Sequence, residues 1–214
     1  MTEASLDLAS LLCSRLCHDM MSPVGALANG LELLADEKDP DMRKRCFELL
    51  EQSARMASDK LRFFRLAFGA GSVGSGEPVP VSEAQALVAG LTGSTQRITV
   101  NWVLSGETLP LAAVKTLLNF ALIGTQALVR GGTLDIGAEQ HEHGTEIVVR
   151  AAAERIAFDP DVGRALDGTL PSAELTSRTA PAAMTHALAA SIGGHVQYMK
   201  TGDALLLGAE LPAA

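Results

Sequence analysis

Two long runs of apolar residues at helical spacing open the sequence and restrict what it can fold into. The first run recurs in steps of three and four, which places one stripe along a single helix: Leu8, Leu12, Leu16, Met20, Val24, Leu27, Leu31 and Leu34. Asp39 and Pro40 then predict a reversal, because Asp39 can cap a second helix and Pro40 fits its first turn. The second run continues at similar spacing to Phe68 and stops at Gly69. Residues 1–68 are therefore predicted to form a helical hairpin.

A hairpin of only two such helices leaves much of its apolar surface uncovered. Two copies packed around one axis would cover that surface and form a four-helix bundle with a continuous core. The sequence therefore predicts a homodimer that is held together by its first 68 residues.

The rest of the chain has a different organisation. Residues 69–80 contain too much Gly and Pro to pack as an element, so we interpret them as a linker. Residues 81–214 alternate helical patterns, at 82–91, 111–129, from Pro160 and at 181–191, with β-rich segments at 98–104, 133–138, 146–151, 195–199 and 204–207. This order of helices and mostly antiparallel strands predicts a two-layer α/β sandwich.

Composition excludes several classes of function. The chain has 25 acidic against 17 basic residues, which opposes a general affinity for nucleic acid. It has neither an apolar run of the ~20 residues that cross a bilayer nor a signal-peptide pattern, so we expect a cytoplasmic protein without a membrane partner. Cys13, Cys17 and Cys46 lie in helical patterns and are expected to be packed, reduced thiols. A metal site at Cys13 and Cys17 would need a second ligand pair.

His18 is the residue on the first helix that attracts attention. It follows Leu16 by two residues, about 200° round the helix, and so points away from the apolar stripe toward solvent. Its face carries small or polar residues that would let another protein approach the imidazole: Ser14, Arg15, Ser22, Gly25 and Asn29. Pro23 lacks an N–H and crowds the carbonyl of Asp19, which predicts a bend beside His18.

An exposed histidine on a helix is usually inert, but the residues around this one are distinctive. His18-Asp19 with Pro23, on the first of two antiparallel helices, is similar to the phosphoacceptor motif of sensor histidine kinases. Leu16-Cys-His-Asp19 resembles still more closely the ChpT family of alphaproteobacterial histidine phosphotransferases, and the resemblance extends to Arg65–Ala70 and nearly the whole chain. It implies that His18 carries a phosphoryl group from a CckA-like hybrid kinase receiver to CtrA- and CpdR-like response regulators in cell-cycle control.

This chemistry suggests roles for the neighbours of His18. A neutral imidazole nitrogen can attack an aspartyl phosphate. Asp19 is either the residue that orients the ring or an ordinary surface charge, and Arg15 can pair with phosphoryl oxygens or with acidic receiver residues. Ser22, Gly25 and Asn29 are expected to contact the receiver. We expect no cofactor or metal in this chain, because the receiver would bring the Mg²⁺.

The part of the chain after the linker resembles the ATP-binding domain of histidine kinases but departs from it in several motifs. Their Asn-x-x-x-Asn-Ala helix corresponds to Asn119–Gly124, where Ile123 replaces the Asn that holds Mg²⁺. Their Gly-Leu-Gly-Leu helix start corresponds to Thr179–Ala182, where Pro181 removes a phosphate-binding N–H. An Asp-x-Gly-x-Gly segment is missing after the strand of Glu146. These departures oppose a sensor kinase core that phosphorylates His18 from ATP, which is the main rival hypothesis.

A non-catalytic dimeric scaffold is a third hypothesis for this chain. The intact and accessible His18 opposes it, since a scaffold needs no exposed nucleophile.

The histidines outside the first helix are expected to have no catalytic part. His141 and His143 flank a predicted turn and would face a metal together only with further ligands, so we expect them to be solvated. His186 and His195 are expected to serve packing.

Overall fold

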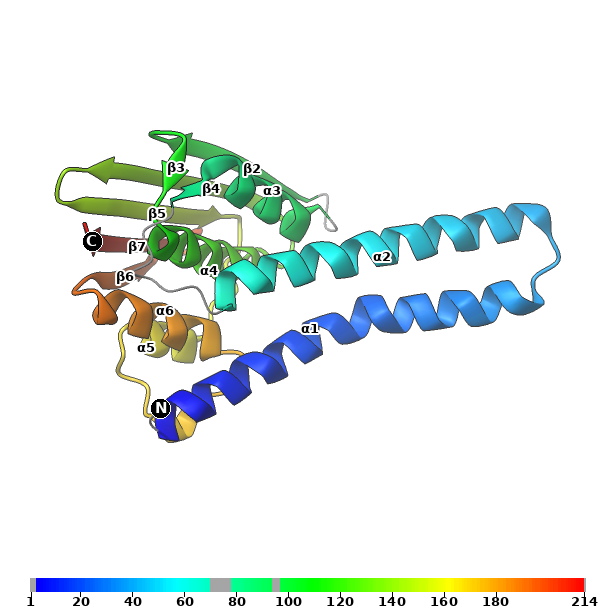
Figure 1. The fold of residues 1–214 in the computed structure, drawn as a ribbon, viewed down its shortest axis with the longest axis horizontal. Helices are drawn as coiled ribbons and strands as arrows, with labels where there is room; N and C mark the ends of the chain where they lie inside the picture. The colour runs from blue at the N-terminus through cyan, green and yellow to red at the C-terminus, as the bar shows by residue number, and fades with distance from the viewer. Residues whose placement is uncertain (1–2, 70–77, 94–96, 214) are drawn as a thin grey trace.

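The computed structural model of the chain describes residues 3–69, 78–93 and 97–213. Two long antiparallel helices, α1 (Glu3–Asp36) and α2 (Pro40–Phe68), form the predicted hairpin, which projects from the remainder of the molecule (Figure 1). The Asp39 carboxylate accepts from the backbone N–H of Asp41 and of Met42, both at 2.9 Å, as expected of an N-cap. The Gly69 N–H donates to the Arg65 carbonyl at the other end of α2. The caps predicted from the sequence therefore set both ends of α2.

The apolar surface of α1 consists of two neighbouring stripes. Residues of the first stripe are buried or half-buried and lie on the side that packs on α2 or on the C-terminal part: Leu16, Met20, Pro23, Leu27, Gly30 and Leu34. The second stripe is exposed in the single chain and comprises Cys17, Met21, Val24, Ala28, Leu31 and Ala35. Within it Val24 and Leu31 are 50% and 59% exposed, so the hairpin covers only part of the apolar surface that the sequence predicts.

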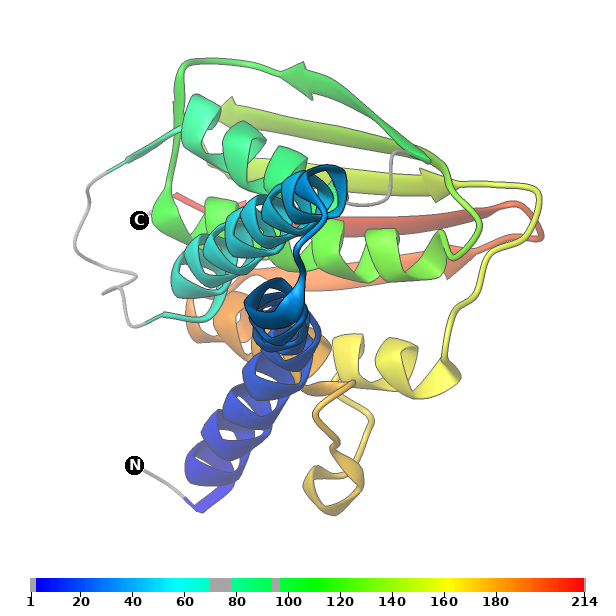
Figure 2. The ribbon, with the colours of Figure 1, turned by 90° about the vertical axis from the view of Figure 1, so that its right-hand side faces the viewer.

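The C-terminal part is a two-layer α/β sandwich, as predicted. Its five-stranded sheet has the order β2 (Ile98–Leu104), β4 (Gly132–His141), β5 (Gly144–Ala152), β7 (Ala204–Pro212) and β6 (His195–Lys200), with β2 and β4 parallel and the other pairs antiparallel. One face of the sheet is covered by α3 (Val81–Thr92), α4 (Leu111–Ala127), α5 (Pro160–Leu166) and α6 (Ala180–Ser191). Figure 2, a view along the hairpin, shows these helices between the hairpin and the sheet.

Three short elements were not predicted. β1 (Val79–Pro80) pairs with β3 (Thr108–Leu109), and a 3₁₀ turn covers Ser172–Glu174. The end of the expected linker at residues 69–80 is therefore part of a small ladder, because Val79 and Pro80 pair with another strand. Residues 70–77 lie outside the described residues.

The hairpin and the sandwich share one core. Phe63, Phe64 and Ala67, at the end of α2, are at most 2% exposed and belong to the cluster that contains the apolar residues of α4.

Within the described residues, no helix combines the length and apolarity needed to cross a membrane. The expectation for the cysteines was partly wrong: Cys46 is buried, but Cys13 and Cys17 are exposed in the single chain because they lie away from α2.

Candidate functional site

His18 lies on the exposed side of α1 and is held by its neighbour in sequence. Its side chain is 75% exposed, and its Nδ1 lies 3.1 Å from Oδ1 of Asp19. The other carboxylate oxygen of Asp19, Oδ2, accepts from Nε of Arg15 at 2.8 Å. Arg15 is one helical turn before Asp19, and both side chains are largely covered. Arg15, Asp19 and His18 therefore form a chain of polar contacts that ends at an accessible imidazole.

These polar contacts favour one tautomer of the His18 ring. When Nδ1 carries the proton and donates it to the Asp19 carboxylate, the lone pair of Nε2 is free. Nε2 is the ring atom farther from the backbone. The arrangement therefore suits attack by Nε2 on an electrophile that approaches from outside the molecule.

Pro23, five residues after His18, disturbs the hydrogen bonding of α1, and α2 compensates for it. Pro23 cannot donate to the carbonyl of Asp19, four residues earlier. That carbonyl instead accepts from Nζ of Lys60, on α2, at 3.0 Å. The helix continues through Pro23, and Figure 1 shows that α1 changes direction part-way along its length, in agreement with the predicted bend. Lys60 thus satisfies the backbone group that the proline leaves without a partner.

The C-terminal domain provides a second wall opposite His18. A cleft of about 400 Å³ is lined by Arg15 and His18 from α1, by Gln126 at the end of α4, and by Ser177 and Arg178 just before α6. Arg178 is 66% exposed in its side chain and lies 3.6 Å from the carboxylate of Asp159. The cleft therefore places the guanidinium groups of Arg15 and Arg178 near the exposed His18.

Sequence reasoning missed the residues of the second wall. Gln126, Ser177 and Arg178 lie more than 100 residues after His18, so their proximity depends on how α4 and α6 pack against the hairpin. One signal was available: Arg178 directly precedes Thr179–Ala182, the segment that corresponds to a phosphate-binding helix start in the kinases.

The predicted partner-contacting residues divide into two groups. Ser22 and Gly25 lie along the His18 face; Ser22 is exposed, and a Cβ added at Gly25 would meet nothing within 4 Å. Asn29 belongs elsewhere, because it lines a separate hollow near the hairpin tip with Glu32, Leu33, Asp36 and Glu37. The structure therefore brings Arg15 to the cleft of His18 but does not bring Asn29 there.

Comparison with known proteins identifies the family of this chain. Residues 81–204 match the family model described as the histidine phosphotransferase C-terminal domain. The "Protein phosphotransferase ChpT" of Brucella abortus (strain 2308) is 34% identical over 210 residues, which is 98% of each chain. This chain belongs to the ChpT-type histidine phosphotransferases. A solved bacterial phosphotransferase has the same fold, with a TM-score of 0.83, 31% identity and 98% of both chains covered.

The fold of this phosphotransferase is also that of histidine kinases. The histidine kinase domain of the blue-light activated histidine kinase EL346 from Erythrobacter litoralis superposes with a TM-score of 0.50 at 10% identity, covering 89% of this chain and 94% of that chain. In the phosphotransferase, Ile123 is buried in α4, and the start of α6 is filled by Thr179, Ala180 and Ala182, each at most 2% exposed. These positions carry methyl groups where a nucleotide site needs polar ligands and open backbone N–H groups.

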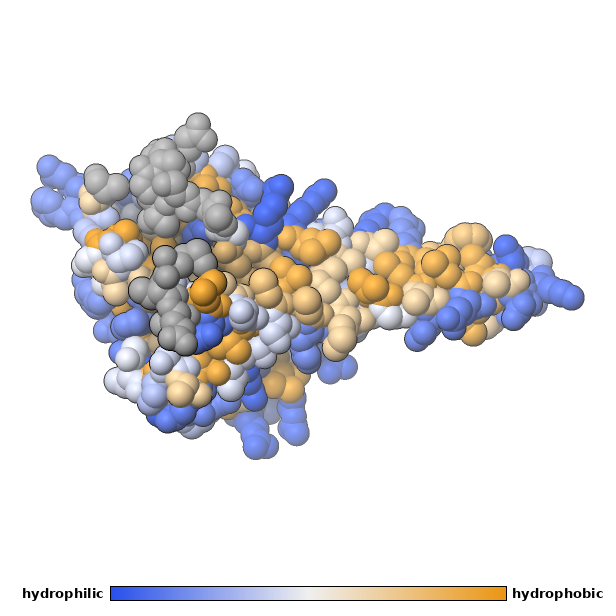
Figure 3. All heavy atoms as spheres, turned by 60° about the horizontal axis from the view of Figure 1, so that its bottom comes forward, coloured by the Kyte–Doolittle hydropathy of each residue, from blue (hydrophilic) through white to orange (hydrophobic). Residues whose placement is uncertain are grey.

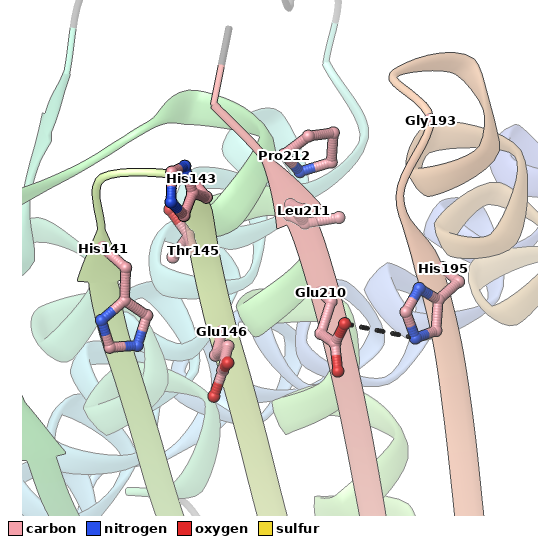
Figure 4. A pocket seen from close by; sticks show the side chains of 10 residues that line it. His141, His143, Thr145, Glu146, Gly193, His195, Glu210, Leu211 and Pro212 are labelled. Carbon is pink, nitrogen blue, oxygen red and sulfur yellow. Dashed lines mark ion pairs between the residues drawn. The ribbon is translucent and has the colours of Figure 1, made fainter.

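A second histidine-rich hollow of this phosphotransferase lies at one end of its sheet (Figure 4). It is lined by residues that include His141, His143, Glu146, His195 and Glu210, and Nε2 of His195 lies 3.7 Å from the Glu210 carboxylate. The described part of the chain contains no group of three His, Cys, Asp or Glu residues placed to hold a metal ion. His141 and His143 are exposed, as predicted for a solvated turn.

The two remaining histidines differ from each other. His186 is half-buried, and its Nδ1 lies 2.9 Å from the Leu166 carbonyl, in agreement with a packing role. The same prediction was wrong for His195, which is exposed because its side chain lies on the uncovered face of β6.

Proposed function

We propose that this histidine phosphotransferase relays phosphoryl groups between receiver domains through His18. The observation that carries the proposal is the exposed His18, at a cleft with Arg15 and Arg178. Its Nδ1 is held by Asp19, whereas its Nε2 has no hydrogen-bond partner among the described residues. Asp19 orients the ring, and Arg15 orients Asp19. Ser22 and Gly25 leave room for the receiver along the same face of α1.

The transfer step moves one phosphoryl group and leaves the electrons balanced. The Nε2 lone pair attacks the phosphorus of the receiver's aspartyl phosphate, the N–P bond forms, and the P–O bond to the aspartyl carboxylate breaks with its electron pair on oxygen. The ring then carries a positive charge that its Nδ1–H shares with the Asp19 carboxylate. Guanidinium groups are suited to the phosphoryl oxygens, because they offer paired donors and a fixed positive charge.

The partners follow from the family resemblance. We propose a CckA-like hybrid kinase receiver as donor and CtrA- and CpdR-like response regulators as acceptors, in the cytoplasm and in cell-cycle control. Mg²⁺ would come with the receiver, since hard cations need clustered oxygen ligands and the described residues offer no such cluster. The second domain acts in docking and binds no ATP, a proposal supported by the buried Ile123 and the filled start of α6.

A homodimer is part of the proposal. The interface would be the exposed stripe of α1 from Cys17 to Ala35. Its large apolar side chains support this assignment, because they are uncovered in the single chain: Met21 is 66% exposed and Leu31 is 59% exposed. Figure 3 shows hydrophobic side chains along the projecting hairpin. A second hairpin would bury these side chains in a four-helix bundle.

One experiment separates this function from a sensor kinase core and from a non-catalytic scaffold. The purified chain is incubated with the phosphorylated receiver of a CckA-like kinase and, separately, with labelled Mg-ATP. We expect labelling of the wild type from the receiver alone and no labelling of His18→Gln from either donor. Labelling of His18 from ATP would instead establish a sensor kinase core. No labelling from either donor would favour the scaffold and overturn the proposal.

The His18→Gln chain also reports on docking, because the substitution removes the nucleophile and keeps the shape of the surface. We expect it to bind the receiver with nearly wild-type affinity, measured by calorimetry. Loss of binding together with transfer would mean that the substitution disturbs the docking surface, in which case the missing label would not identify the phosphoacceptor.

A further inference from the structure

The end of α2 lies in the core of the C-terminal domain. Phe63 and Ala67 are 0% exposed and Phe64 is 2% exposed, and the rings of Phe64 and Phe68 stack with centroids 5.2 Å apart. The hairpin is therefore anchored at this end by packing.

Two polar side chains of α4 accompany this apolar contact. Lys115, 4% exposed, donates from Nζ to the Gly69 carbonyl. Asn119, 0% exposed, donates from Nδ2 to the Ala67 carbonyl at 3.4 Å and to the Lys115 carbonyl at 2.8 Å. The last carbonyls of a helix have no partner within the helix and attract positive charge. Lys115 and Asn119 therefore cap the C-terminal end of α2 from another element.

Such a cap has an energetic cost that apolar residues would avoid. A buried amine must give up its hydration, and this desolvation lowers the pKa of Lys115 from its ordinary value of 10.5. Buried polar contacts add little to stability over apolar packing, but they specify one arrangement of the elements they join. In this structure the elements that Lys115 and Asn119 join are α4 and the end of α2.

The same face of α4 leads to the phosphotransfer cleft. Lys115, Asn119 and Gln126 follow one another at steps of four and seven, so they share a face of the helix. Gln126 lies eleven residues after Lys115, about 16 Å along the axis, and lines the cleft of His18. α6 packs on both α4 and α1 and begins two residues after Arg178. The position of the second wall therefore depends on how α4 is held against α2.

We propose that Lys115 and Asn119 are positioning residues for phosphotransfer: by capping the end of α2 they fix the C-terminal domain on the hairpin and hold Gln126 and Arg178 opposite His18. The inference rests on the proposed function. It gives Asn119 a structural role. In the resemblance to histidine kinases, Asn119 corresponds to part of the nucleotide-binding motif, whereas we propose that this domain binds no ATP.

The test compares Lys115→Met and Asn119→Leu with a control on the same helix. Both substitutions keep the approximate shape of the side chain and remove its donors. Thr116→Val is the control, because Thr116 is also fully buried and its hydroxyl has no hydrogen-bond partner among the described residues. For each variant, KM and kcat are measured for transfer from the phosphorylated CckA-like receiver. The rate at which the small donor phosphoramidate phosphorylates His18, which needs no docking, is measured in parallel.

We expect the KM for the receiver to rise about tenfold or more in Lys115→Met and Asn119→Leu, since small displacements of a docking wall are costly. At neutral pH the phosphoramidate rate and the midpoint of urea unfolding should stay at the wild-type values, and Thr116→Val should resemble the wild type throughout. A defect that is merely structural would lower the unfolding midpoint and slow both donors.

Two results overturn the inference. One is a wild-type KM in both Lys115→Met and Asn119→Leu; the other is an equal loss with the receiver and with phosphoramidate, which would locate the defect at His18 itself. Failure of the proposed function looks different, because the wild type would then accept no phosphoryl group from the receiver.

Discussion

At the scale of single residues, the reactivity proposed for His18 depends on neighbours that fix its ring and its backbone. Asp19 holds Nδ1, and Arg15 holds Asp19. Nζ of Lys60 donates a hydrogen bond to the Asp19 carbonyl, to which Pro23 cannot donate because it has no N–H. The backbone next to His18 is thus bent by a proline, and the Asp19 carbonyl that the proline leaves without a donor still accepts a hydrogen bond.

Asp19→Asn tests the contribution of the carboxylate. The amide keeps the size of the side chain but removes the charge that favours a proton on Nδ1 and stabilises the ring after attack. We expect kcat for transfer from the receiver to fall by about tenfold or more, with receiver binding unchanged. Rapid-quench measurement of phosphohistidine formation gives the rate. A wild-type rate would make Asp19 an ordinary surface charge.

Lys115 offers a prediction about pH. Burial lowers its folded-state pKa below the unfolded value of about 10.5, so the folded chain releases this proton first as the pH rises. Between the two pKa values the unfolded chain binds more protons, and stability therefore rises with pH through that window. Urea unfolding of wild type and Lys115→Met should show the wild type gaining stability relative to the variant as the pH rises toward 10.5. An unchanged difference would mean that Lys115 is not desolvated in the fold.

At the scale of elements, α1 has three distinct faces. One stripe packs on α2, the next stripe, from Cys17 to Ala35, is exposed and apolar, and the His18 face carries Ser22 and Gly25. The faces are separated because residues one position apart differ by about 100° round a helix. Docking and dimerisation are therefore predicted to respond to different substitutions of the same helix.

Larger side chains on the His18 face test whether receivers dock there. Ser22→Arg and Gly25→Trp add side chains where the structure has open surface, since nothing lies within 4 Å of a Cβ at Gly25. Transfer needs the two reacting atoms to approach within about 3.5 Å, so we expect weaker receiver binding and transfer slowed by roughly tenfold or more. Calorimetry and light scattering should show reduced affinity and an intact dimer. Wild-type transfer in both variants would mean that receivers approach by another face.

At the scale of the whole molecule, the chain combines a projecting hairpin with a sandwich that shares its core. The sandwich covers the base of the hairpin and forms one wall of the cleft, whereas the stripe of α1 from Cys17 to Ala35 is exposed in the single chain. The surfaces that we propose for the receiver and for a second copy of the chain are therefore separate.

Leu31→Asp tests the proposed dimer. Burying an unpaired carboxylate in each half of the bundle core should cost about 3 kcal/mol or more, which raises the dimer dissociation constant at least about a hundredfold. Leu33→Asp is the matched control, because Leu33 is also exposed, at 65%, but lies on the opposite side of α1. Light scattering should give monomers for the first variant and dimers for the second. Dimers in both would move the interface away from this stripe.

Local patterns were sufficient to predict most of the elements and the exposed position of His18. The steps of three and four, Asp39 with Pro40, and the β-rich segments depend on interactions within a few residues, so the helices, the caps of α2 and the five main strands were predicted. His18 and Asp19 are adjacent in sequence, and their contact needs only the helix itself.

Contacts between distant segments were decided by the tertiary structure alone. Gln126, on α4, and Arg178, just before α6, reach the cleft because these helices pack against the hairpin, and Lys60 reaches the Asp19 carbonyl because α2 packs on α1. β1 formed within the expected linker for the same reason: its partner β3 lies nearly thirty residues later. The sequence alone determined which groups share a helix face with His18, whereas the packing of helices on the hairpin decided which charges lie across the cleft from it. The physical reason is that helical periodicity defines a face but not what lies opposite it.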